Sequence, residues 1–131
     1  MAEFFVRIVF CFIVGNSDMH LKNFSLIETA EASGKYVLSP AYDLLTVNAN
    51  MPSDQEQFAL AMNGKKMNIR KGDFLKFADA YGIARQTAEK LIKSLVKRTP
   101  QWLEMCNESL LPNELKDRLI KIITERAETI K

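Results

Sequence analysis

The feature that most constrains the fold is an apolar run from Phe4 to Val14, FFVRIVFCFIV, which is followed at once by the polar stretch GNSDMHLKNF. The run is eleven residues long and contains Arg7, whereas a helix that spans a bilayer needs roughly 20 apolar residues. Only the residues MAE precede it, without the basic residues of a secretory signal. Because it is apolar on most of its helical surface, we predict a buried central helix that ends at Gly15-Asn16.

Two turn signals predict β-hairpins. Ser33-Gly34 lies between FSLIE and KYVLS, two short β-prone runs. Asn63-Gly64, in QFALAMNGKKMNI, is the stronger signal, because both central residues of a type I′ turn need a positive φ. A two-residue loop there would put four apolar side chains on one face, since it pairs Leu60 with Met67 and Phe58 with Ile69.

From Asp73 onward the apolar residues recur with a helical period. They form three stripes: Phe74, Phe77, Ala78 and Tyr81; Ala88, Leu91, Ile92, Leu95 and Val96; Leu115, Leu119, Ile122, Ile123 and Ile130. Gly82 closes the first stripe, Thr99-Pro100 predicts a break or kink in the second, and Pro112-Asn113 begins the third. The sequence therefore predicts a mainly α fold with small β-hairpins (α+β).

The composition is that of one globular domain over residues 1–131. Hydrophobic residues make up 47% of the chain and charged residues 26%, which excludes a disordered chain. The net charge of +2 is too small to indicate a direct nucleic-acid partner or an anionic membrane. Cys11 and Cys106 have no partner cysteines at metal-binding spacing. We therefore expect reduced thiols and a cytoplasmic protein.

The polar stretch after the first helix carries residues suited to phosphoryl transfer. Asp18 and Asn23 stand five positions apart, the spacing at which the catalytic loop of protein kinases places a proton-accepting Asp and a Mg²⁺-binding Asn. Lys22, between them, is available to contact the transferred phosphate. Asp43 lies twenty residues beyond Asn23, just after the first predicted hairpin. Because Mg²⁺ completes its shell with phosphates and water, one Asp and one Asn suffice as protein ligands.

Together the two segments resemble the HipA family, bacterial serine/threonine kinases of toxin–antitoxin systems that are distantly related to the eukaryotic kinase fold. The family pattern N-x-D-x-H-x-K-N-x-S, then P-x-Y-D, is met here by Asn16, Asp18, His20, Lys22, Asn23, Ser25, Pro40, Tyr42 and Asp43. The stretches DFLKFADAYGI, AEKLIKSLV and LLPNELKDRL are also similar to the C-terminal part of that family. The resemblance covers nearly the whole chain and implies the helical large lobe of a protein-kinase-like fold.

The resemblance also implies a reaction and partners that the composition does not indicate. The reaction is transfer of the ATP γ-phosphoryl group to a protein hydroxyl, with Asp18 as catalytic base or orienting acid and Lys22 against the phosphate. Asn23 and Asp43 would hold Mg²⁺, and His20 would orient the loop, as the histidine beside the catalytic Asp does in kinases. The implied substrate is an aminoacyl-tRNA synthetase or another translation factor, and the implied partner is a DNA-binding antitoxin.

Two other interpretations stay open. Asp18, His20 and Asp43 could form a metallohydrolase site, although such sites usually bring further His or Asp ligands and this chain has one histidine. Alternatively, the chain could be a non-catalytic interaction module that binds an antitoxin or a separate small-lobe chain.

A kinase also needs a small lobe, with a loop that covers the phosphates and a strand lysine, and we expect this lobe to be missing here. The five glycines are scattered, and three residues precede the helix of the catalytic loop. The chain would then be a fragment, a truncated gene product or one half of a split protein. Since holding reactants in place is worth roughly 7–11 kcal/mol, we expect little or no activity from this chain alone.

Overall fold

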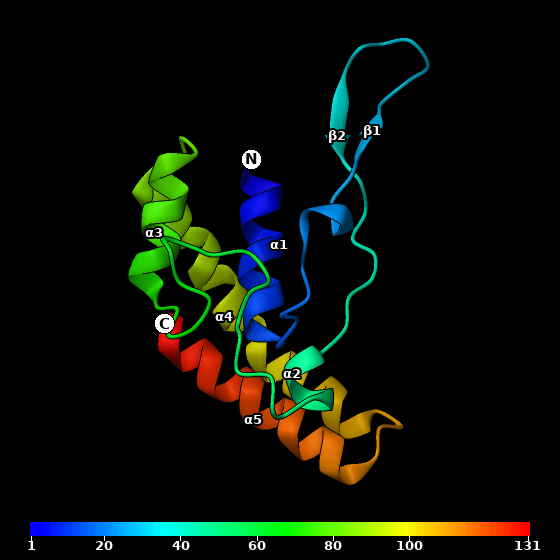
Figure 1. Cartoon of the computed structure of the whole chain (residues 1–131), viewed down its shortest axis with the longest axis vertical. Helices are drawn as coiled ribbons and strands as arrows, with labels where there is room; N and C mark the ends of the chain where they lie inside the picture. Colours follow the sequence, from blue (N-terminus) through cyan, green and yellow to red (C-terminus); the bar gives the residue numbers. More distant parts are fainter.

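The computed structural model describes residues 1–131 and is mainly helical (Figure 1). In chain order its elements are α1 (Ala2–Ile13), the 3₁₀ turn η1 (Leu21–Asn23), β1 (Leu26–Glu28), β2 (Tyr36–Leu38), α2 (Val47–Asn50), α3 (Lys71–Ala80), α4 (Arg85–Glu108) and α5 (Asn113–Ile130). The predicted fold class, mainly α with a small β-hairpin, is confirmed. None of the helices is both long and apolar enough to cross a membrane.

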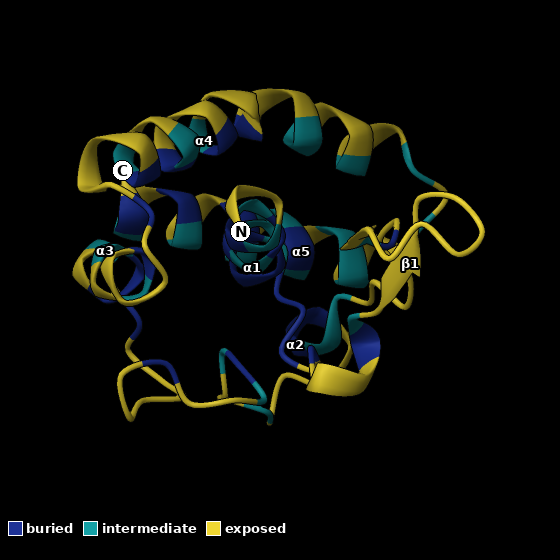
Figure 2. Ribbon diagram, turned by 90° about the horizontal axis from the view of Figure 1, so that it is seen from above, coloured by how far each residue is buried: buried dark blue, intermediate teal, exposed yellow.

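Helix α1 lies in the middle of the helical body, as its apolar sequence predicts. Figure 2 looks along α1 and shows α3, α4 and α5 arranged around it. Phe5 and Phe12 of α1 have no exposed surface. They belong to a cluster of 18 buried apolar residues that includes Phe74 of α3, Ile92 of α4 and Ile123 of α5. The helix that leads into the polar loop is thus fixed on several sides by core packing.

Helix α1 ends at Gly15-Asn16, as predicted. Gly15 has φ +76°, the left-handed conformation that glycine adopts most readily. The Asn16 N–H donates to the Cys11 carbonyl at 2.9 Å and the Gly15 N–H to the Phe12 carbonyl at 3.3 Å, which is the Schellman pattern of a helix end. A Cβ on Gly15 would lie 3.1 Å from Cγ2 of Ile122 in α5. The chain therefore turns sharply into the polar loop while packed against α5.

The first predicted hairpin is confirmed. Strands β1 and β2 pair antiparallel, with Ile27 opposite Val37, and Gly34 in the loop between them has φ +66°. The hairpin projects away from the helices (Figure 1). Its apolar side chains are largely in solvent, with Leu26 65% and Tyr36 61% exposed.

The second predicted hairpin is wrong beyond its turn. Asn63 and Gly64 have φ +51° and +75°, and Met62 and Lys65 form one isolated antiparallel bridge, so the turn itself forms. No strands extend from it, and the four apolar residues do not share a face. Phe58 and Ile69 are buried, at 5% and 0% exposure, whereas Leu60 and Met67 are 44% and 42% exposed.

The reason lies on the second arm of the turn. Asn68 has φ +54°, which interrupts the extended backbone that a strand needs. The Ile69 N–H donates to the side-chain oxygen of Gln57 at 2.8 Å instead of to a strand carbonyl. The turn packs on α3, where Lys65 Nζ lies 2.9 Å from Oδ1 of Asp73 and the Asn63 amide donates to the Asp73 carbonyl at 3.0 Å.

Of the break or kink predicted at Thr99-Pro100, the break is wrong. Helix α4 runs without interruption from Arg85 to Glu108 with Pro100 inside it. Proline removes one backbone donor from the helix, but α4 packs along α1, α3 and α5, and these contacts hold both of its halves. Figure 2 shows α4 arching over the other helices.

Candidate functional site

The polar loop after α1 brings Asp18 and His20 into direct contact. His20 Nε2 lies 3.2 Å from Oδ1 of Asp18, and the two side chains are 48% and 53% exposed. The backbone supports the pair, since the His20 N–H donates to the Asp18 carbonyl at 3.0 Å. Met19, between them, is buried at 4% exposure and lines an apolar cavity of about 160 Å³. The loop is thus anchored through Met19 while Asp18 and His20 face solvent.

The buried side chain of Asn23 binds the backbone of the same loop. It is 4% exposed, and its Nδ2 donates to the backbone carbonyl of Asp18 at 2.8 Å. An amide oxygen is one of the hard donors that Mg²⁺ accepts, and the role of Asn23 as a metal ligand stays a prediction.

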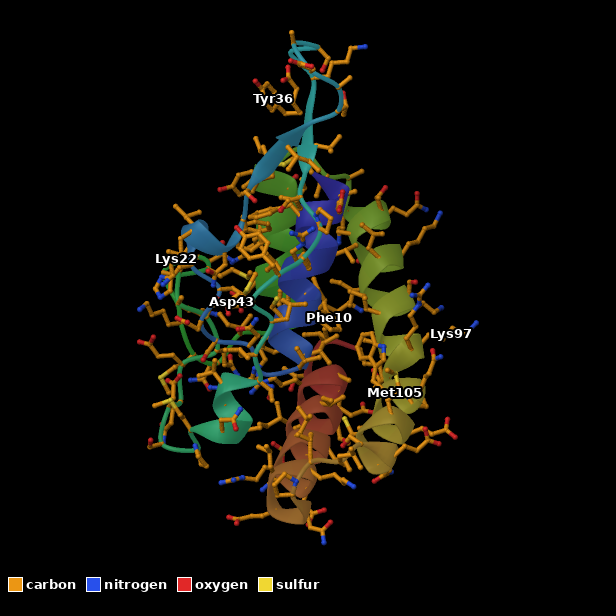
Figure 3. All side chains as sticks on the ribbon, turned by 90° about the vertical axis from the view of Figure 1, so that its right-hand side faces the viewer. Phe10, Lys22, Tyr36, Asp43, Lys97 and Met105 are labelled. Carbon is orange, nitrogen blue, oxygen red and sulfur yellow. The ribbon has the colours of Figure 1, made fainter.

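The segment carrying Asp43 reaches the loop through its neighbour Tyr42. The Tyr42 hydroxyl donates to the backbone carbonyl of Lys22 at 3.0 Å, across twenty residues of sequence. Asp43 itself has φ +53°, a left-handed conformation that aspartate, like asparagine, adopts more often than most other residues. Figure 3 shows Lys22 and Asp43 on the same side of α1.

The structure thus joins some of the five predicted site residues directly and others only through the backbone. Asp18, His20 and Asn23 are in contact, whereas Lys22 and Asp43 are both exposed and form no ion pair. Tyr42 ties their two segments together. This role of Tyr42 was not predicted from the sequence, although its place in the P-x-Y-D pattern was the available signal.

The donor atoms present fit Mg²⁺ better than a metal held entirely by protein. No three His, Cys, Asp or Glu side chains gather where they could hold a metal ion. The Asn23 amide oxygen and the Asp43 carboxylate are hard oxygen donors from two segments. Mg²⁺ is typically held by one or two such groups, with phosphate and water as its other ligands.

The two cysteines take no part in this loop. Both are free thiols, Cys11 buried and Cys106 half-buried. Burial raises the pKa of Cys11 to about 11, against smaller opposing effects of the Arg7 charge and a hydrogen bond from Asn16. Burial also raises the pKa of Cys106, while the charge of Lys116 lowers it. Neither thiol has the electropositive, exposed surroundings of a reactive cysteine.

A helical lobe that presents Asp, His, Lys and Asn on one loop, tied to a second acidic turn, is the arrangement of a kinase-like protein. Residues 1–103 match the family described as HipA-like C-terminal domain. The chain belongs to this HipA-like family, which confirms the resemblance inferred from its motifs.

Two relatives carry kinase names. A Haemophilus influenzae protein named "Putative kinase" is 26% identical, over 95% of this chain and 40% of the relative. "Putative kinase Y4dM" of Sinorhizobium fredii is 37% identical, over 76% of this chain and 23% of the relative. The chain therefore matches less than half of the length of either protein.

Proposed function

We propose that this chain is the C-terminal catalytic lobe of a HipA-like serine/threonine kinase that transfers the γ-phosphoryl group of ATP to a protein hydroxyl. The observation that carries the proposal is the loop in which Asp18, His20 and Asn23 bind one another, tied by Tyr42 to the segment of Asp43. The family membership and the kinase names of the relatives support the same class of reaction.

Each side chain has a specific task in this proposal. Asp18 takes the proton of the acceptor hydroxyl. The hydroxyl oxygen bonds to the γ-phosphorus of ATP while the bond from the γ-phosphorus to the β-phosphate oxygen breaks, which releases ADP. His20, 3.2 Å away, holds the Asp18 carboxylate in place. Lys22 contacts the transferred phosphoryl group. Asn23 and Asp43 hold Mg²⁺, which neutralises the phosphate charge when bound.

The decisive experiment compares two substitutions in the kinase formed by this chain and the lobe that completes it. Asp18→Asn removes the proton acceptor but no metal ligand, so turnover should collapse while ATP–Mg²⁺ still binds. Asp43→Asn removes charge from the metal site, so nucleotide affinity, Mg²⁺ dependence and rate should all fall. Asp79→Asn, at an exposed position of α3, is the matched control.

Calorimetric titration of ATP–Mg²⁺ and a phosphorylation assay separate these effects. If Asp43→Asn binds nucleotide normally and still turns over, Asp43 is not the metal ligand. For the isolated chain we expect weak or undetectable ATP binding and no phosphorylation. Robust turnover by the chain alone would contradict the division of the site between two lobes.

A second role, as an interaction module, is favoured by an apolar surface at the start of α1. A hollow of about 510 Å³ is lined by one acidic and seven apolar residues: Glu3 with Met1, Phe4, Phe24, Leu26, Tyr36, Val37 and Leu38. A two-stranded hairpin is marginally stable by itself, and large exposed apolar patches mark interaction sites. We propose that the part of the kinase outside the matched region, present in the longer relatives, covers this surface.

Binding of that complementary part, measured by calorimetry, tests the second role. Leu26→Lys and Tyr36→Lys should abolish binding, whereas Leu110→Lys should not, because Leu110 is fully exposed outside this surface. Full binding by both hairpin variants would contradict the proposed surface.

The remaining partners follow from the family resemblance. We propose an aminoacyl-tRNA synthetase or other translation factor as the phosphoryl acceptor and a DNA-binding antitoxin as the protein partner, all in the bacterial cytoplasm. Incubation of the completed kinase with synthetases and radiolabelled ATP tests the first, and labelling of none of them would contradict it.

A further inference from the structure

Arg126 of α5 occupies an unusual position against the end of α1. Its two terminal nitrogens donate to neutral acceptors, NH1 to the Phe12 carbonyl at 2.7 Å and NH2 to Oδ1 of Asn48 at 2.6 Å. Its guanidinium carbon lies 5.2 Å from the centre of the Phe12 ring. No carboxylate lies within ion-pair distance of it. Burial lowers the pKa of Arg126 to about 10, against the opposing charges of Asp54 and Glu125. The half-buried guanidinium of Arg126 thus binds two neutral groups, the Phe12 carbonyl and the Asn48 side chain.

Asn48, the second of these groups, is a buried junction. Its backbone N–H donates to the Gly15 carbonyl at 3.0 Å. Its Nδ2 donates to the carbonyls of Asp54 and Glu56, both at 3.0 Å, and approaches the Ser17 hydroxyl at 3.4 Å. Arg126 occupies the side-chain acceptor Oδ1, so it and the Asp54 and Glu56 carbonyls together fix which way the Asn48 amide faces.

The junction joins the two halves of the candidate site. Ser17 immediately precedes Asp18, is 4% exposed and donates to Oδ2 of Asp54 at 2.9 Å. Asn48 lies five residues after Asp43, in the short helix α2. The bonds of Asn48 to Gly15 and Ser17 therefore connect the backbone just before Asp18 to the backbone just after Asp43.

We propose that Arg126 is a positioning residue of the site: through Asn48 it holds the Asp18 loop and the Asp43 segment at a fixed separation. An effect of Arg126 on metal binding rests on the proposed function, whereas the hydrogen-bonded link from Arg126 through Asn48 to the two segments does not. Arg126 lies beyond the residues matched by the family model, which end at 103.

The test uses the whole chain and two matched controls on the same helix. Arg126→Gln removes the charge and the pair of donors that bind Phe12 and Asn48 at the same time. Arg118→Gln removes an arginine that lines the same polar surface hollow as Asn48 and Arg126 but pairs with Glu114 at 3.7 Å. Ile123→Val removes one methyl group from the core next to Arg126. It controls for the stability that Arg126→Gln loses, because it leaves the bonds of Asn48 intact. Arg126→Lys, which keeps the charge and one donor, serves if Arg126→Gln does not fold.

Two measurements distinguish the hydrogen-bonded link through Asn48 from its effect on metal binding. Amide hydrogen exchange of Asn48 reports the bond to Gly15. Mn²⁺, a paramagnetic substitute for Mg²⁺, should broaden the imidazole signals of His20, the single histidine of the chain. In Arg126→Gln we expect faster Asn48 exchange than in Ile123→Val, and a Mn²⁺ dissociation constant raised by about tenfold, the effect typical of lost supporting bonds around a metal site. Both controls should stay within about twofold of the wild-type constant, because neither touches the junction that supports the metal site.

Unchanged Asn48 exchange in Arg126→Gln would overturn the link, whatever the metal does. Faster exchange with unchanged Mn²⁺ affinity would overturn the positioning role and leave only a structural one. If His20 does not respond to Mn²⁺ in the chain alone, the titration is repeated with ATP and the lobe that completes the kinase, because phosphate supplies part of the metal shell. No response there would refute the metal site of the proposed function, and Asn48 exchange still decides whether Arg126 holds the two segments.

Discussion

Replacing Gly15 by alanine should separate two costs at the entrance to the polar loop. Gly15 and Gly82 both end helices with nearly the same backbone, φ +76° and +73°, but a Cβ on Gly82 would meet nothing within 4 Å. A Cβ on Gly15 would lie 3.1 Å from Cγ2 of Ile122 and 3.4 Å from Oγ1 of Thr46. Gly82→Ala therefore carries only the left-handed backbone cost, about 1–2 kcal/mol.

Gly15→Ala carries that cost and an overpacking cost of about 1–3 kcal/mol, so we expect a total loss of about 2–5 kcal/mol. Against a typical stability of about 5–15 kcal/mol this is a large fraction. Urea unfolding of both variants, followed by circular dichroism, measures the difference. Equal losses in the two variants would refute the packing of the loop entrance against α5, because the backbone cost is common to both.

Three further outcomes follow from individual contacts. Burial alone would raise the pKa of Asp73, but bonds from the Arg70 N–H, Lys65 and Asn63 outweigh it and lower the pKa below its usual 3.8. The stabilisation is therefore present above pH 3.8 and lost as the pH falls through the lower folded-state pKa; urea midpoints of wild type and Asp73→Asn should converge there, and a constant gap would contradict it. Native Cys11 should resist iodoacetamide at pH 8 as judged by mass spectrometry, since its pKa is about 11; rapid alkylation of folded protein would contradict its burial. Tyr42→Phe removes an exposed hydrogen bond, so stability should change by less than about 1 kcal/mol while the Mn²⁺ effect on His20 weakens; an unaltered Mn²⁺ titration would deny Tyr42 a part in the site.

Features fixed by neighbouring residues were predictable from the sequence. The end of α1 needs only a glycine that tolerates positive φ and two backbone bonds that reach back to Cys11 and Phe12. The hairpin of β1 and β2 likewise follows from two β-prone runs around Ser33-Gly34. The resemblance to HipA kinases depended on motifs of the same local kind.

The predictions of a second hairpin and of a break in α4 were wrong because contacts between residues far apart in the sequence outweighed a local signal. Asn63-Gly64 formed the expected turn, but Phe58 and Ile69 were both drawn into the core, and Asn68 broke the strand that would have joined them to the turn. Pro100 failed to break α4 because packing on three other helices holds the turns on both sides of it.

The polar links behind the site have no signal in a single sequence. Arg126 and Asn48 are 78 residues apart, and Asn48 and Ser17 are 31 apart, so no periodicity or spacing connects them. An arginine in an amphipathic helix is ordinarily explained by solvation along its exposed face. Only the fold shows that this one faces the end of α1.

The site is therefore held by two links of different strength. The Tyr42–Lys22 bond lies at the surface, where water competes for both groups and a hydrogen bond adds little. The Arg126–Asn48 junction is largely withdrawn from water, where a bond left unmade is costly because the remaining partner cannot be resolvated. Loss of the exposed bond should therefore cost less than loss of the buried one. In the proposed function, the buried junction would set the base from which Asp18 projects, and the Tyr42 bond would add a weaker constraint on the acidic turn that carries Asp43.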